Sequence, residues 1–299
     1  MRGLGIDGGG SATRWAICDA AGGLVARGEL PAVVGHLTDA AGLARLAAIC
    51  AGLPRQMAVG RIVAGITGLS AGTAEAAGAR DVISAAVHLA PAAVEVRDDM
   101  WIAYHAAFAP GAGHLVYAGS GSIGVHLRAD GALVRVGGRG FLIDDGGSAF
   151  WIGRTALDLV WRRLDREPGW CSPLSEALHA AAGGASWDAV RRHVYGGGRN
   201  AVAQLARAVA AADDDDARAI LHAAGSELAR LALALCHREG NLPVVLTGRA
   251  AGLHAAILAG FRAAAPLLGV RHVETDAALA AARLAVGARP EQGRASGEK

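Results

Sequence analysis

The sequence predicts an α/β protein of two lobes, each built on a mixed β-sheet with helices on its faces. The main observation is an internal duplication. Residues 5–28 read as apolar strand, glycine loop, strand, glycine turn and strand, and residues 114–138 repeat that order. Each repeat is followed by helices and by further apolar strands. A duplicated unit of this kind predicts two similar lobes whose glycine loops face each other across a cleft.

The first half alternates short apolar runs with helical stretches. Continuous apolar runs such as "RIVAGITG" are typical of buried parallel strands, whereas "TRWAIC" alternates like a half-exposed strand. We expect Thr38 to cap the first helix. The elements predicted here are strands at 2–7, 13–19, 24–30, 61–68 and 92–99, and helices at 38–52, 71–89 and 99–109.

The second half is mostly helical after its three initial strands. Long stretches of this half have the apolar pattern of helices. The run "PVVLTG" is predicted as one more strand. The elements predicted after the repeat are helices at 147–164, 172–183, 199–210, 214–239, 250–264 and 276–287, and strands at 243–248 and 270–273.

Composition narrows the functional classes. Only 4% of the 299 residues are aromatic, the formal net charge is +2, and there is no basic run, so we expect no nucleic-acid partner. The N-terminus lacks the apolar segment of a signal peptide, and we expect a cytoplasmic protein without membrane association. The four cysteines form no C-x-x-C pair, which makes a zinc or redox site unexpected and favours small buried thiols.

The two glycine loops are candidates for phosphate binding. Glycine-rich turns at strand ends let backbone N–H groups point at an anion, although either loop alone is also consistent with a tight hairpin. A Walker A loop is excluded because the sole lysine is Lys299. A Rossmann loop opens a helix, whereas "SATRWAIC" after Gly10 alternates like a strand.

Three motifs in this order resemble a known family. The strand followed by "DGGGS", the later "AGSGS" and the later "GGRGFLIDDGGS" resemble the BadF/BadG/BcrA/BcrD-type ATPases, and within them the N-acetylglucosamine kinases. These belong to the sugar kinase/Hsp70/actin superfamily, so the resemblance implies an actin-like, ribonuclease H-like ATPase fold. It covers residues 2 to about 287.

The resemblance implies a sugar kinase that uses ATP and Mg²⁺. It places Asp99 of "VRDDMW" as the catalytic base, which also contacts the sugar, and Asp7 at the magnesium through water. The Asp98–Asp99 pair is alternatively a helix cap. Further residues are implied at the nucleotide (Gly8, Gly9, Gly10, Ser11, Gly119, Ser120, Gly121, Thr247 and Gly248) and at the sugar (Gly121, Ser122, Gly138 and Asp145).

The expected domains follow from the same assignment. They are an N-terminal lobe at 1–112 completed by a helix at 276–288, a C-terminal lobe at 113–275, and a disordered tail at 289–299. The expected partners are a small sugar, N-acetylglucosamine or a related amino sugar or hexose, and a second copy of the chain in a homodimer.

The departures from the family lie on the sugar side. No asparagine precedes Asn200, although the family has a sugar-binding one early in the chain, and Arg139 stands where the family has tryptophan. Arg139 either selects an acidic or phosphorylated sugar or simply pairs with Asp144. Two rival functions remain. One is an iron–sulfur ATPase that activates a 2-hydroxyacyl-CoA dehydratase, disfavoured because no cysteine lies between Cys50 and Cys171; the other is a non-catalytic sugar or nucleotide sensor.

Overall fold

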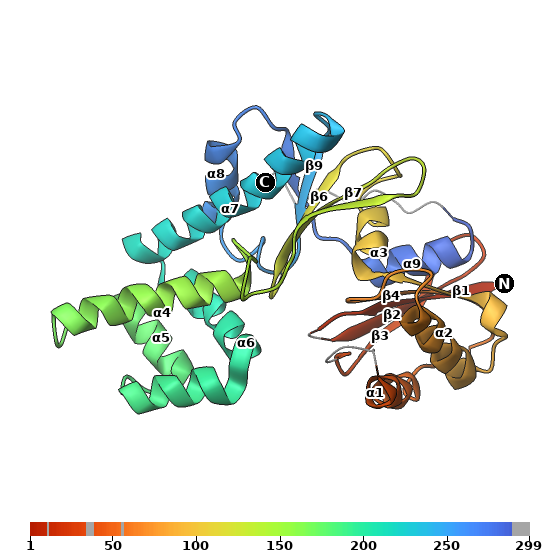
Figure 1. Cartoon of the computed structure of the whole chain (residues 1–299), viewed down its shortest axis with the longest axis horizontal. Helices are drawn as coiled ribbons and strands as arrows, with labels where there is room; N and C mark the ends of the chain where they lie inside the picture. The colour runs from red at the N-terminus through yellow and green to blue at the C-terminus, as the bar shows by residue number, and fades with distance from the viewer. Residues whose placement is uncertain (11, 34–38, 55–56, 289–299) are drawn as a thin grey trace. The chain divides into compact units, whose positions relative to one another are not determined.

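The computed structural model describes the chain except for residues 11, 34–38, 55–56 and 289–299. The described chain forms two compact units. Unit 1 comprises Met1–Pro110 and the segment from Thr275 through the last helix, and unit 2 comprises Gly111–Glu274. Each unit has its own five-stranded mixed sheet. Figure 1 labels β1 to β4 in unit 1 and β6, β7 and β9 in unit 2. The prediction of two mixed sheets rather than one continuous sheet is confirmed.

The sheet of unit 1 has the strand order β3-β2-β1-β4-β5. Strands β1 to β3 form an antiparallel meander, whereas β4 and β5 run parallel to β1. Helices α1 and α2 cover one face, and α3 and α9 cover the other (Figure 1). The elements are β1 Arg2–Gly8, β2 Thr13–Cys18, β3 Leu24–Leu30, α1 Ala40–Cys50, β4 Val59–Ile66, α2 Ala74–Val87, a 3-10 turn Pro91–Ala93, β5 Val94–Asp98, α3 Asp99–His105 and α9 Ala277–Ala285.

Helix α9 comes from the far end of the sequence and packs closely on β1. Its face toward the sheet is almost all alanine, with Ala278 and Ala282 in one cluster with Ala16 and Cys18. A Cβ atom at Gly5 of β1 would overlap the backbone of this helix, so small residues on both sides set the close approach.

The sheet of unit 2 repeats this plan with the order β10-β9-β6-β7-β8. Strands β6 to β8 form an antiparallel meander, and β9 and β10 run parallel to β6. The elements are β6 His114–Ala118, β7 Ser122–Leu127, β8 Leu133–Gly137, α4 Ala149–Arg166, α5 Pro173–Ala182, α6 Trp187–Ala212, α7 Asp215–Glu239, β9 Val244–Thr247, α8 Ala255–Ala264 and β10 Val270–His272.

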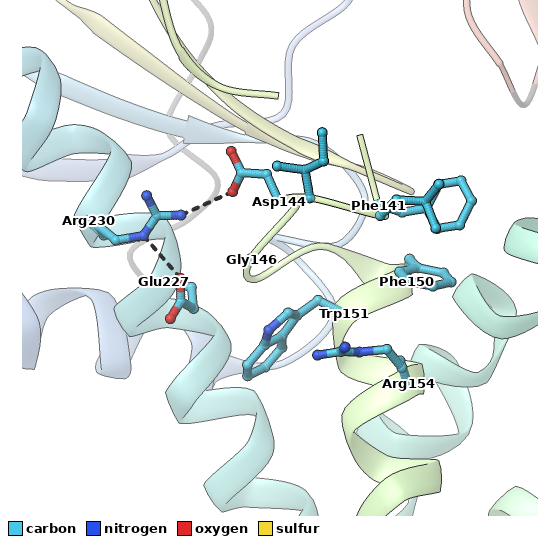
Figure 2. A pocket seen from close by; sticks show the side chains of 10 residues that line it. Phe141, Asp144, Gly146, Phe150, Trp151, Arg154, Glu227 and Arg230 are labelled. Carbon is cyan, nitrogen blue, oxygen red and sulfur yellow. Dashed lines mark hydrogen bonds and ion pairs between the residues drawn. The ribbon is translucent and has the colours of Figure 1, made fainter. Parts of the chain in front are cut away.

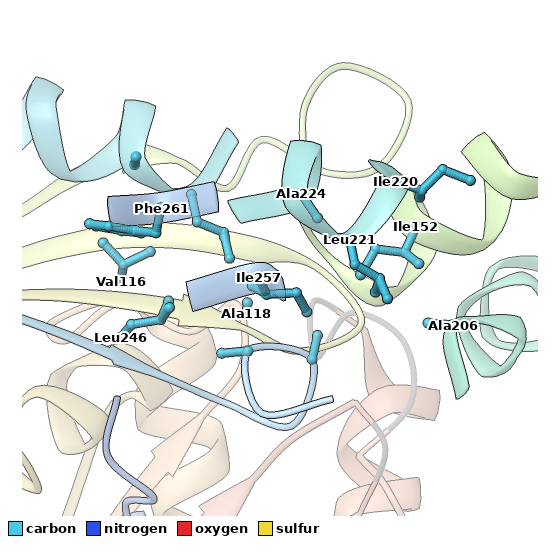
Figure 3. Close-up of a cluster of buried hydrophobic side chains, with 14 of the residues drawn as sticks. Val116, Ala118, Ile152, Ala206, Ile220, Leu221, Ala224, Leu246, Ile257 and Phe261 are labelled. Atoms are coloured by element: carbon cyan, nitrogen blue, oxygen red, sulfur yellow. The ribbon is translucent and has the colours of Figure 1, made fainter. Parts of the chain in front are cut away.

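A single large apolar cluster forms the core of unit 2 (Figure 3). It joins β6 and β9 to the helices through residues such as Val116, Leu246, Ile152, Leu221 and Phe261. Helix α7 supplies many of its members. In the described part of the chain α7 is the one helix long and apolar enough to cross a membrane, and 56% of its apolar window is buried inside the unit, as in a core helix.

Three of the differences from the sequence prediction concern the starts of helices. Asp39 caps α1 by accepting from the Gly42 N–H, whereas the expected cap Thr38 lies outside the described residues. Helix α6 begins at Trp187, twelve residues before the predicted start at 199, and is interrupted by non-helical dihedral angles at Gly198. Helix α8 begins at Ala255 because turns occupy the residues just before it.

Candidate functional site

The carboxyl ends of the parallel strands of unit 1 bring its predicted site residues to one edge of the sheet. In the strand register Asp7 lies opposite Gly65, and Gly8 lies opposite Ile66, which in turn lies opposite Asp98. Asp99 follows directly as the first residue of α3. Polar residues at the carboxyl edge of an open α/β sheet are the usual positions for ligand contacts.

The hydroxyl of Thr67 links the Asp99 carboxylate to the first glycine loop. It lies 2.6 Å from Asp99 Oδ2 and 3.1 Å from the carbonyl oxygen of Gly8, and the Thr67 N–H also donates to that carbonyl at 3.0 Å. A hydroxyl carries one proton, so it donates fully to only one of these acceptors at a time. Asp99 is therefore held at a defined distance from the backbone of the glycine loop.

Burial and neighbouring charges raise the pKa of both carboxyl groups at this edge. The pKa of Asp99 is raised to about 7, first by burial and then by the nearby carboxylates of Asp98 and Asp7, while the Thr67 hydroxyl and the Met100 N–H oppose the rise. The pKa of Asp7 is raised to about 6 by burial, against the lowering effect of Arg14. A carboxyl group that titrates near neutral pH suits proton transfer.

The two adjacent aspartates play different structural parts. Asp98 is the N-cap of α3, and its Oδ1 accepts from the Met100 N–H at 2.9 Å. Asp99 Oδ1 accepts from the same N–H at 2.9 Å, while its second oxygen contacts Thr67. The capping alternative therefore holds for Asp98, and Asp99 keeps one oxygen directed toward the Thr67 side.

The first glycine loop is a tight hairpin between β1 and β2. The Gly9 N–H donates to the carbonyl oxygen of Ala12 at 3.1 Å, and Gly10 lies exposed between them. Ser11, predicted at the phosphate, lies outside the described residues. The loop thus joins two antiparallel strands rather than opening a helix, as the sequence indicated.

The second glycine loop and the predicted adenosine segment lie together at the carboxyl edge of the sheet in unit 2. Tyr117 lies opposite Thr247 in the register of β6 and β9, so Gly119–Gly121 and Gly248 follow adjacent parallel strands. The Gly119 N–H donates to the Gly121 carbonyl oxygen at 2.8 Å, which closes a tight turn around Ser120.

Asp145 is the center of a buried polar network beside this loop. It adopts a left-handed conformation with φ 67°, rare outside glycine, and its side chain is 4% exposed. Oδ1 accepts from the Ser122 N–H at 3.2 Å and Oδ2 accepts from Arg199 Nη2 at 3.0 Å, while the Ser122 hydroxyl donates to the Gly146 carbonyl oxygen at 2.7 Å. Burial raises the pKa of Asp145, and the Ser122 and Arg199 contacts oppose that rise.

The remaining predicted sugar residues belong to the loop between β8 and α4. Gly138 has φ 68° and a Cβ atom there would overlap Ile123, the residue that follows Ser122. Arg139 is 66% exposed and lies 3.7 Å from Asp144, which also pairs with Arg230. Of the two expectations for Arg139, pairing with Asp144 is what the structure shows.

A cavity of ≈ 270 Å³ lies beside this loop, between α4 and α7 (Figure 2). Its walls include Phe141, Phe150 and Trp151, with Arg154 and the Glu227–Arg230 ion pair at its polar parts. The glycine loops, Ser122 and Asp145 do not line it. The cavity is therefore lined by the chain neighbours of Asp145, namely Asp144 and Gly146, and not by the predicted site residues themselves.

A family model matches residues 4–259 of the chain, that of the BadF/BadG/BcrA/BcrD ATPase family. The chain belongs to the BadF/BadG/BcrA/BcrD ATPase family. It is accordingly an ATPase-family protein, and ATP is the nucleotide that the family binds. A comparison with curated proteins finds no match.

Solved structures agree with this family in fold. A candidate N-acetylglucosamine kinase from Chromobacterium violaceum is 29% identical with a TM-score of 0.73, the match covering 95% of this chain and 98% of that one. A second candidate N-acetylglucosamine kinase, from Porphyromonas gingivalis, is 18% identical with a TM-score of 0.78, and the match covers 95% of this chain and 98% of that one. A ROK family glucokinase from Streptomyces griseus, bound to glucose and AMPPNP, is 13% identical with a TM-score of 0.61, covering 95% and 99%. The fold is therefore the actin-like ATPase fold of sugar kinases.

Sequence reasoning missed two residues of these groups, Thr67 and Arg199. Thr67 lies at the end of a parallel strand, and the polar side chain in the run "GITG" was a usable signal. Arg199 follows three consecutive glycines inside a helix, which marks a break but not the partner that the break serves.

Proposed function

We propose that the protein is an ATP-dependent sugar kinase whose acceptor is N-acetylglucosamine or a related amino sugar or hexose. The observation that carries the proposal is Asp99, a carboxylate fixed at the sheet edge by Thr67, beside the first glycine loop, with its pKa raised to about 7. Resemblance to the candidate N-acetylglucosamine kinase at 29% identity supports this choice of acceptor class.

In this proposal Asp99 accepts the proton of the sugar hydroxyl that attacks the γ-phosphate. Phosphoryl transfer requires little covalent help, so the carboxylate mainly orients the hydroxyl and takes its proton late. The base must be ionised to do so, and a pKa of about 7 leaves a substantial ionised fraction at neutral pH. In the ionised state the Thr67 hydroxyl donates to Asp99 Oδ2, while the Met100 N–H donates to Oδ1. These two hydrogen bonds fix the orientation of the carboxylate.

The nucleotide phosphates are assigned to the backbone of the two glycine loops. Glycines at 8–10 and at 119 and 121 leave the loop backbone without Cβ atoms, so an anion can approach that backbone closely without a lysine. Thr247 and Gly248 follow the parallel strand next to the second loop and are assigned to the adenosine side.

The residues of unit 1 suit a magnesium ion held largely by water. Asp7 supplies a hard carboxylate oxygen at the sheet edge, and burial raises its pKa in a way that a cation would reverse. Among the described residues no three His, Cys, Asp or Glu side chains gather as a metal cage, which agrees with the few protein ligands that Mg²⁺ takes beside phosphates. Bound there, Mg²⁺ would neutralise charge on the transferring phosphoryl group.

The sugar is assigned to Asp145 with Ser122, Gly121 and Gly138. Asp145 is held by two donors from the protein and retains further lone pairs for hydroxyl groups. The early asparagine and the tryptophan of the family are absent from this chain. We therefore propose a class of acceptor, an amino sugar or hexose, rather than one particular sugar.

A coupled assay of ADP release over a panel of hexoses and amino sugars tests the proposal. We expect ADP release to depend on one or a few sugars, with a sugar phosphate formed in equal amount. ATP hydrolysis that no sugar stimulates would reject the kinase and favour the ATPase-activator rival. Absence of any turnover with intact ATP binding would favour the sensor.

A further inference from the structure

Arg199 reaches the second glycine loop through an interruption in helix α6. The three glycines 196–198 precede it, and Gly198 has φ 58° and ψ −148°, values that a helix does not allow. A new helical segment starts after this break and runs to Ala212. The break therefore turns Arg199 away from the axis of the preceding segment and toward the polar network of Asp145.

The guanidinium group of Arg199 lies directly against the loop. Nη2 donates to Asp145 Oδ2 at 3.0 Å, and a Cβ atom placed on Gly121 would lie 2.5 Å from Nη2. The group also lies over the ring of Phe141, with Cζ 5.6 Å from the ring centroid. A side chain at position 121 would therefore displace the ends of the Arg199 and Asp145 side chains.

Asp145 uses only part of the hydrogen-bonding capacity of this arginine. A guanidinium has five N–H donors and binds carboxylates best through two parallel bonds, yet Asp145 takes one. Nε is buried and has no hydrogen-bond partner among the described residues, and 35% of the side chain is exposed. The donors that Asp145 leaves unused on this partly exposed guanidinium can bind an anion.

The charge of Arg199 lies directly against the second glycine loop, where it could bind a phosphate. The sole lysine of the chain is Lys299, and Arg139 is exposed and paired with Asp144. The start of a helical segment adds partial positive charge at the position of Arg199. We propose that Arg199 binds a phosphoryl group at the second glycine loop, either the γ-phosphate of the nucleotide or the phosphate carried by the sugar.

This inference rests on the proposed function only in that the second loop binds phosphate. A purely structural role is the alternative, in which Arg199 does no more than balance the buried charge of Asp145. The two roles differ in what a neutral replacement changes. Loss of a phosphate contact lowers affinity for ligands that carry that phosphate, whereas loss of charge balance lowers stability and affects all ligands alike.

The test compares Arg199→Gln with Arg139→Gln, which removes one positive charge from an exposed arginine in the same unit. Titration calorimetry measures binding of AMPPNP, of ADP and of a hexosamine 6-phosphate to each protein. We expect Arg199→Gln to weaken AMPPNP or the sugar phosphate by about 10–100-fold, the loss of a charge-assisted hydrogen bond, with ADP changed by less than about threefold. Arg199→Lys should recover part of the affinity because it keeps the charge but not the fork.

The arms separate the two sources of the phosphoryl group. A loss confined to AMPPNP assigns the γ-phosphate, and a loss confined to the sugar phosphate assigns the phosphorylated acceptor. If Arg199→Gln binds all three ligands as Arg139→Gln does, or loses all three equally, the proposal is overturned. Should Arg199→Gln fail to fold, the double variant Arg199→Gln/Asp145→Asn is measured against Asp145→Asn alone, so that the loss of the sugar-site carboxylate is common to both. Nucleotide binding is read without a sugar, so failure of the kinase proposal leaves the AMPPNP and ADP arms interpretable.

Discussion

The two units share one strand order but hold their key carboxylates in opposite electrostatic surroundings. In unit 1, Asp99 lies near two other carboxylates, Asp98 and Asp7, and makes no ion pair with any described residue. In unit 2, Asp145 forms an ion pair with Arg199 and accepts from a backbone N–H. The same strand order thus occurs twice, and burial raises the pKa of both carboxyl groups, but nearby carboxylates add to the rise at Asp99, whereas Arg199 opposes it at Asp145.

The strongest test of this difference is Asp99→Asn. The substitution keeps the shape of the side chain and removes the proton acceptor, so we expect sugar phosphorylation to fall by about 10²–10⁴-fold. ATP binding should persist because the glycine loops are unchanged. Asp98→Asn is the matched control; it keeps an oxygen able to cap α3 and should cost far less. Near-normal turnover by Asp99→Asn would show that the two carboxylates do not differ in role.

Thr67→Val should produce a smaller effect with a distinctive pH dependence. The Thr67 hydroxyl lowers the pKa of Asp99, so its removal should move the acidic limb of the kcat/KM profile to higher pH. A hydrogen bond to a charged group is worth about 1.5–3 kcal/mol, which corresponds to a shift of about one to two pH units and about tenfold lower activity at pH 7. Thr67→Ser should restore the profile. If kcat/KM fell equally at every pH, with no shift of the acidic limb, Thr67 would have only a packing role.

The raised pKa of Asp99 also predicts how stability depends on pH. Between about pH 4 and pH 7 the folded protein retains a proton that the unfolded chain has released, so the free energy of unfolding should fall as pH rises through this window. Asp99→Asn lacks this ionisation and should gain stability relative to the wild type from pH 5 to pH 8. Denaturant unfolding at several pH values measures the difference, and a difference independent of pH would contradict the burial of this group.

The smallest effect is expected for Arg139→Trp, which restores the residue usual in the family. Arg139 is 66% exposed and pairs loosely with Asp144, so the ranking of sugars should stay the same. Relative kcat/KM values over the same panel of sugars provide the measurement. A changed ranking of the sugars would show that Arg139 contacts the acceptor, and that Arg199 is not the only arginine of unit 2 that acts at the site.

Local signals in the sequence were enough for most of the fold. The glycine loop after Asp7, the alternation of "TRWAIC" and the repeat at residue 114 depend on neighbours in the chain, and each yields a strand or turn where it was expected. The first half of α6 was missed because the glycines 196–198 look like the end of a loop rather than a break within a helix.

The contacts that tune the carboxylates could not be predicted in this way. Thr67 is 32 residues from Asp99, and Arg199 is 54 residues from Asp145, so only the folded chain shows that they meet. Sequence patterns specify which face of an element is buried, but the pairing of two polar side chains at a sheet edge depends on register and on helix breaks. Asp99 itself was predicted from resemblance, whereas its hydroxyl partner required the register of β4 and β5.

The docking of α9 on β1 has a consequence for how the protein is made. Unit 1 begins at the first residue, yet the alanine face that covers its sheet is not translated until residues 277–285. Nascent chains usually fold from the N-terminus as domains emerge, but here α3 alone can cover this face of the sheet while all of unit 2 is synthesised. During that interval Gly5 and Ala16, on which α9 packs in the folded chain, lack that cover. Unit 1 is thus the first to be synthesised but the last to receive all of its elements. A stop codon before residue 277 would leave unit 1 without α9.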